Sequence, residues 1–73
     1  GNPQAQYTLA EMYETGRGAT HSLIGAYVWY QVALSSGNDK AREPFDRLKR
    51  ALSTEEISEA EEQLRKLRGG REK

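Results

Sequence analysis

The sequence opens with GNPQA at residues 1–5, and a related stretch, GNDKA, occupies residues 37–41, a spacing of 36 residues. Extending the alignment places Leu9 opposite Phe45, so apolar positions keep the same register in both halves. Repeats of this length are typical of solenoids, in which each helical unit buries its apolar face against the next unit. The spacing therefore predicts an all-α fold of antiparallel helical hairpins stacked as an α/α superhelix.

Short-range signals place two helices in the first half of the chain. Asn2 is a favoured N-cap and Pro3 a favoured first helical residue, because the N–H that proline lacks would be unpaired there in any case. Glycines within residues 16–18 permit the left-handed turn that commonly ends a helix. Ser22 is then the expected N-cap of a second helix, which runs to about Ser36.

The second half of the chain carries two further helix signals. A third helix begins near Asn38, and Pro44 either kinks it or restarts it near Glu43, because proline has no backbone N–H and crowds the preceding turn. Ser53 and Glu56 have the spacing of a capping box, which is the clearest helix start in the sequence. We therefore expect a last helix from this point, with one apolar and one charged face.

These signals describe one domain in three parts. We expect a complete repeat hairpin at residues 1–36, a degenerate C-terminal capping hairpin at residues 37–68, and a flexible tail at residues 69–73. The chain begins with glycine and not with methionine, so we expect a piece cut from a longer repeat protein. A single hairpin does not bury both its faces, so its open end would meet a missing repeat or a second copy of this chain.

A family resemblance rests on the spacing of small, aromatic and glycine residues in the first half. The positions that carry it are Asn2, Ala5, Tyr7, Leu9, Ala10, Met12, Tyr13, Gly16, Gly18, Ala26, Trp29, Tyr30, Ala33 and Gly37. This pattern resembles a Sel1-like repeat, a relative of the tetratricopeptide repeat with a longer, glycine-bearing turn. Residues 52–67 resemble the helix that often closes such arrays. Ala19, Ser22 and Pro44 depart from the family pattern, and Pro44 affects the expected geometry of the second hairpin.

The resemblance implies a role and a surface for that role. Family members typically act as adaptors in protein complexes, and many of them are bacterial. In such superhelices the first helix of each repeat lines the concave surface that holds ligands. Carried onto this chain, the pattern turns five residues toward that surface and makes them the expected partner-binding residues: Gln4, Tyr7, Glu11, Glu14 and Thr15. The alternative is that these are ordinary solvated positions, with Tyr7 packed on a preceding repeat.

The charge balance argues against several classes of partner. Eleven basic and eleven acidic residues give a net charge of zero, so the chain lacks the basic excess with which proteins bind nucleic acid or anionic membranes. No apolar run approaches the length of a membrane span. With no cysteine, the chain forms neither disulfides nor thiolate metal sites. We expect no nucleic-acid partner, no membrane contact and no cofactor.

The residues that could carry chemistry have simpler structural explanations. His21 is the only histidine and lies in a polar turn without a second ligand at metal-binding spacing. The acidic pairs at residues 55–56 and 61–62 fall in the first turn and on the polar face of one helix, where carboxylates favour the helix dipole or solvent. Ser53 has no base at a useful spacing, and capping explains it. We therefore expect no metal site and no enzyme.

The function that these observations favour is binding of a partner protein or peptide through a helical-repeat surface. One alternative is a structural cap or oligomerisation unit without a ligand, which self-associates through its exposed ends. A third alternative comes from the resemblance, because some relatives are linked to β-lactam handling. It would make the chain a hydrolase of a β-lactam or cell-wall peptide. No nucleophile and base in the sequence support that alternative.

Overall fold

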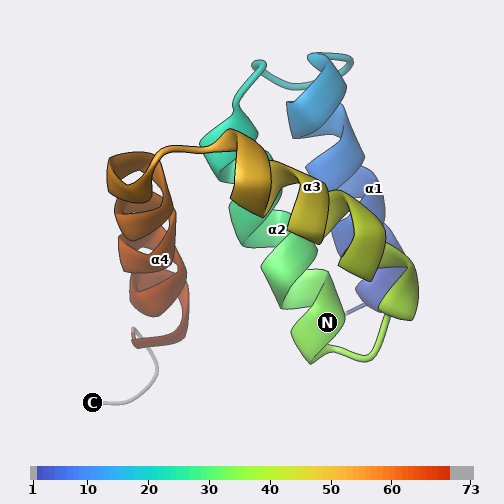
Figure 1. Ribbon diagram of the computed structural model, residues 1–73. Coiled ribbons are helices and arrows are strands. Elements are labelled where there is room, and N and C mark those ends of the chain that lie inside the picture. Colours follow the sequence, from blue (N-terminus) through green and yellow to red (C-terminus); the bar gives the residue numbers. More distant parts are fainter. Residues whose placement is uncertain (1, 70–73) are drawn as a thin grey trace.

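The computed structural model describes residues 2–69, and within this range the chain is helical, with no β-strand (Figure 1). The elements in chain order are α1 (Pro3–Thr15), α2 (Leu23–Ser35), the 3-10 turn η1 (Asp39–Ala41), α3 (Arg42–Ala51) and α4 (Thr54–Gly69). The all-α prediction is therefore confirmed. Gly69 belongs to α4, whereas the rest of the predicted tail, residues 70–73, lies outside the described residues.

Both ends of α1 follow the signals in the sequence. The Asn2 side chain accepts hydrogen bonds from the backbone N–H groups of Gln4 at 2.9 Å and Ala5 at 3.3 Å, two donors that the helix itself leaves unpaired. Gly16 ends the helix with φ 80°, and its N–H donates to the Met12 carbonyl oxygen at 2.8 Å. Glycine adopts this left-handed conformation without steric cost, which explains why the helix stops where the sequence predicts.

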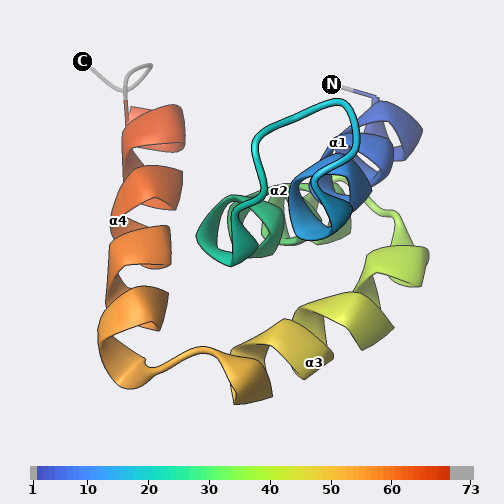
Figure 2. The same ribbon diagram turned by 90° about the horizontal axis from the view of Figure 1, so that it is seen from above.

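α2 is the central helix of the fold. Ser22 Oγ accepts a hydrogen bond from the Gly25 N–H at 2.9 Å, as predicted for the N-cap. α1, η1, α3 and α4 all pack against α2, which Figure 2 shows enclosed by its neighbours. The buried apolar residues come from α2 and from the elements around it: Ala10, Ala26, Tyr27, Val28, Tyr30, Ala33, Ala41, Phe45, Leu48, Leu52 and Ala60.

Small residues let α1 and α2 approach each other closely. Ala10 of α1 and Ala26 of α2 are fully buried. A Cβ atom added to Gly25 would lie 3.2 Å from Cδ1 of Tyr13, which is tighter than ordinary packing. The Tyr13 ring thus fills the space that a larger residue at position 25 would need, and such a residue would push the two helices apart.

Pro44 lies in the first turn of α3 and not in the interior of a longer helix. The Asn38 side chain accepts a hydrogen bond from the Lys40 N–H at 3.0 Å and starts η1, after which α3 begins at Arg42. The first four N–H groups of an α-helix have no partner within the helix, so a proline there removes no hydrogen bond. Of the two alternatives for Pro44, the structure shows the restart close to Glu43.

The capping box at the start of α4 is formed in both directions. The Ser53 N–H donates to Oε1 of Glu56 at 2.9 Å, and the Glu56 N–H donates to Oγ of Ser53 at 3.1 Å. Leu52 is buried and Ile57 is partly buried against the core, on either side of the cap. The local geometry that the sequence predicts for this helix start is therefore confirmed.

α3 and α4 do not pack closely on each other. Each contacts α2, whereas contact between the two helices is slight. Figures 1 and 2 show them diverging from the short connection at residues 52–53. The second half of the chain is therefore an opened pair of helices around α2, and the close antiparallel packing expected of a second hairpin is not seen.

Candidate functional site

The five residues predicted to bind a partner lie on α1, with unequal exposure. Gln4, Glu11 and Thr15 are exposed, whereas Tyr7 and Glu14 are partly buried. Successive members up to Glu14 are three or four residues apart, and Thr15 is four residues from Glu11, so these neighbours lie on one side of the helix. The structure thus holds them on one element, but two of them are committed to contacts inside the protein.

Glu14 joins three helices. Its Oε1 accepts a hydrogen bond from the Tyr30 hydroxyl of α2 at 2.7 Å, and its Oε2 accepts one from the Arg47 guanidinium of α3. The Glu14 side chain is 21% exposed and that of Arg47 is 53% exposed, so the carboxylate is more deeply placed than its cation. Glu14 therefore holds α1 to α2 and α3, and its charge is already balanced within the chain.

Tyr7 packs on Tyr30. Their ring centroids are 5.8 Å apart, with an interplanar angle of 60°, the edge-to-face geometry that aromatic pairs favour. Burial, followed by the charge of Glu11 and a hydrogen bond with it, raises the pKa of the Tyr7 hydroxyl. Burial also raises the pKa of Tyr30, and the hydrogen bond to Glu14 raises it further. Both hydroxyls are therefore neutral donors at physiological pH.

The far end of α1 borders a hollow of about 330 Å³. Its lining contains three of the predicted residues, since it is formed by Thr8, Glu11, Met12, Glu14, Thr15 and Arg17. The Thr15 hydroxyl donates to the Glu11 carbonyl oxygen at 2.9 Å and accepts from the Arg17 N–H at 3.3 Å. It is therefore engaged in hydrogen bonds with the backbone at the C-terminal end of α1. The exposed Glu11 carboxylate is the predicted group that is best placed to meet a partner here.

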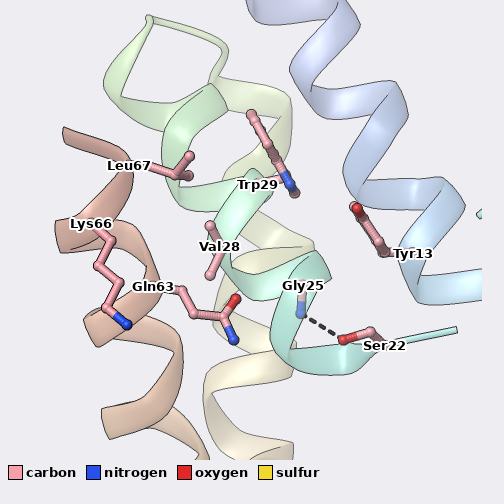
Figure 3. Close-up of a pocket in the computed structure, with 8 residues that line it drawn as sticks. All are labelled: Tyr13, Ser22, Gly25, Val28, Trp29, Gln63, Lys66 and Leu67. Carbon is pink, nitrogen blue, oxygen red and sulfur yellow. Dashed lines mark hydrogen bonds between the residues drawn. The ribbon is translucent and has the colours of Figure 1, made fainter. Parts of the chain in front are cut away.

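A larger groove of about 450 Å³ lies between α2 and α4 (Figure 3). It is lined by Tyr13, Ser22, Gly25, Val28, Trp29, Gln63, Lys66 and Leu67. None of these residues was expected from the sequence to belong to a partner site. The available signal was Leu67, an apolar residue near the end of a charged helix, which is 48% exposed.

Across residues 2–69, no group of three or more His, Asp or Glu side chains converges in a way that could hold a metal ion. The acidic pairs at 55–56 and 61–62 are exposed, and His21 is exposed in its turn. In the same part of the chain no helix combines the length and the apolar character needed to cross a bilayer.

Comparison with known proteins found no relative of this chain. No family model matches the chain, and neither a curated protein nor a solved structure shows significant similarity to it. The likeness to a Sel1-like repeat therefore rests on the residue spacing alone.

Proposed function

We propose that this chain is a protein-interaction module that binds a partner protein or peptide through the exposed face of α1. The observation that carries the proposal is the position of Glu11, an exposed carboxylate at the rim of the 330 Å³ hollow. Its neighbour Glu14 is neutralised by Arg47, which leaves Glu11 as the uncompensated charge of α1.

The chemistry of this face favours a basic segment of the partner. Glu11 supplies a carboxylate, Thr8 and Gln4 supply exposed polar groups, and Met12 supplies an adaptable apolar side chain. α1 itself carries no basic side chain, although Arg17, in the turn that follows α1, also lines the hollow. A lysine or arginine beside an apolar residue would match both properties of the hollow.

Within the same proposal, the chain is the C-terminal end of a Sel1-like array. Support comes from positions that carry the resemblance: Ala10, Ala26 and Ala33 are fully buried, and Gly16 and Gly18 have positive φ in the turn between α1 and α2. In this arrangement α1 would line the ligand-holding side of the superhelix, and α3 and α4 would close its end.

The test compares affinity capture by the wild-type chain and by Glu11→Lys, with calorimetry on each captured protein. We expect capture of a basic partner that Glu11→Lys loses. Glu59→Lys, the same charge change on an exposed position of α4, is the matched control and should bind normally. Equal binding by Glu11→Lys would refute the assignment of this face. Glu14 is unsuitable for such a test, because its reversal would also break the contacts with Tyr30 and Arg47.

A further inference from the structure

The groove between α2 and α4 is built mainly from two helix faces with the same register, and Tyr13 of α1 and the N-cap Ser22 complete its lining. α2 contributes residues 25, 28 and 29, and α4 contributes residues 63, 66 and 67. Each set has the offsets i, i+3 and i+4, which place its members along one face of a helix. The hollow therefore runs between two helix faces, a shape into which the ridge of a third helix packs.

The lining of this groove is mostly apolar, with polar groups from Tyr13, Ser22 and Gln63 and a single charge. Gly25 carries no side chain, Val28 is buried, and Trp29 is partly buried beside them. Leu67 stands at the opposite wall, 48% exposed (Figure 3). Lys66 is the one charged residue among those that line the groove within residues 2–69, and no carboxylate lines it.

Most of the backbone around the groove is already hydrogen-bonded within α2 and α4. Both walls are helices whose interior N–H and C=O groups bond within the helix, and Ser22 Oγ satisfies the free N–H of Gly25. An occupant therefore meets side chains and no open strand edge. Of the common modes of peptide recognition, insertion of an amphipathic helix fits such a surface, whereas addition of a strand does not.

We propose that the α2–α4 groove binds an amphipathic helix of a partner protein, with an apolar side chain seated between Trp29 and Leu67 and a carboxylate facing Lys66. Charge complementarity selects the acidic flank, because Lys66 has no opposite charge within the groove lining. This surface shares no lining residue with the hollow at α1, so it is independent of the function proposed for Glu11.

The single tryptophan of the chain makes the groove directly observable. The probes are two synthetic helical peptides with the same leucine-rich apolar face, one flanked by glutamates and the other by lysines, with helicity checked by circular dichroism. Addition of the acidic peptide should shift the fluorescence emission of Trp29. In the same titration, the amide NMR shifts that change should lie mainly in α2 and α4. Because Lys66 is exposed, we expect the acidic peptide to bind about three- to tenfold more tightly than the basic one.

Three variants separate the contributions to this binding. Lys66→Glu should reverse the preference between the two peptides. Leu67→Ser should weaken both by about tenfold or more, since a leucine buried on binding is lost. Lys49→Glu, an equal charge change on the exposed side of α3, is the matched control and should leave both affinities unchanged. Leu67 and Lys66 are exposed, so all three variants should fold normally, which circular dichroism checks.

Several results would overturn the proposal. Equal affinity for the two peptides, in the wild type or in Lys66→Glu, would remove the role of Lys66. Absence of binding by either peptide at millimolar concentration would remove the site. Concentration-dependent sedimentation without peptide, abolished by Leu67→Ser, would assign the groove to a second copy of this chain. None of these results bears on Glu11, which lies outside the groove.

Discussion

Residues 16–22 connect α1 to α2 and residues 52–53 connect α3 to α4, yet only the first pair of helices packs on itself. α1 and α2 share a long contact, with Gly25 and alanines where the helices meet the core. α3 and α4 instead dock separately on α2, α3 through Phe45 and Leu48 and α4 through a face that includes Ala60. The repeat spacing that the two halves share therefore does not determine which helices pack together.

The distribution of charge explains the difference. Residues 3–35 contain three charged side chains of Asp, Glu, Lys or Arg, whereas residues 36–69 contain sixteen. A helix with one narrow apolar stripe can pack that stripe against only one neighbouring helix, and its charged faces remain in water. When α3 and α4 have each used that stripe on α2, neither retains an apolar face with which to close on the other.

Removal of the Tyr30 side chain should have the largest effect on stability. Tyr30 is 1% exposed, packs on Tyr7 and bonds Glu14, so Tyr30→Ala should cost about 3–5 kcal/mol. Leu64→Ala, in the partly buried face of α4, should cost about 1–2 kcal/mol. Urea unfolding followed by circular dichroism measures both. A loss for Leu64→Ala as large as that for Tyr30→Ala would contradict the unequal roles of the two halves.

Ala60→Asp should separate α4 from the rest of the protein. Ala60 is fully buried, and an unpaired polar group there costs on the order of 2–3 kcal/mol, enough to undock α4 from α2. Hydrogen exchange followed by mass spectrometry should show fast exchange in α4 while α1 and α2 keep their protection. Ser58→Asp, an exposed neighbour on the same helix, is the control. Loss of protection throughout α1 and α2 would show that the hairpin depends on α4.

The ends of the helices were predictable because each is set by a few adjacent residues. Asn2, Gly16, Ser22 and the Ser53–Glu56 box act within one helical turn, and the structure places each where the sequence indicates. The restart at Pro44 was one of two alternatives that the sequence left open, because the choice depends on whether the preceding turn joins the helix.

The long-range contacts were not predictable from the spacing. Arg47 is 33 residues from Glu14, and no local pattern shows that the two meet across α1 and α3. The docking of α4 on α2 depends on competition between apolar faces, which the alignment of the two halves does not resolve. The α2–α4 groove follows from that docking, so its lining could not be assembled before the helices were placed.

Ser53→Ala should affect α4 alone and moderately. The substitution removes the Oγ that accepts the Glu56 N–H, at a cost of about 1 kcal/mol, the usual value for an N-cap. Exchange of the first amides of α4 should accelerate, whereas amides of α1 should not change. Ser53→Thr retains a hydroxyl and should retain most of the protection. If Ser53→Ala accelerated exchange in α1 as strongly as in α4, the two halves would unfold as one unit.

Tyr30→Phe should have the smallest effect at neutral pH and a distinct effect in alkali. Phenylalanine keeps the ring on Tyr7, and Glu14 keeps its bond from Arg47, so the cost at pH 7 should be below about 1 kcal/mol. Burial raises the pKa of Tyr30 above the ordinary value of about 10.

Well below pH 10 the Tyr30 hydroxyl is neutral in the folded and unfolded chains, and there it adds no pH dependence to stability. Above pH 10 the unfolded chain loses this proton while the folded chain holds it, so the free energy of unfolding should fall as pH rises. The free energy of unfolding of Tyr30→Phe should fall less steeply than that of the wild type between pH 9 and 11. The midpoints of urea unfolding at each pH measure this difference. The slope that remains reflects Tyr7 and Tyr27, whose pKa values burial also raises. Identical slopes for the wild type and Tyr30→Phe would mean that Tyr30 ionises as readily in the folded protein as in the unfolded chain.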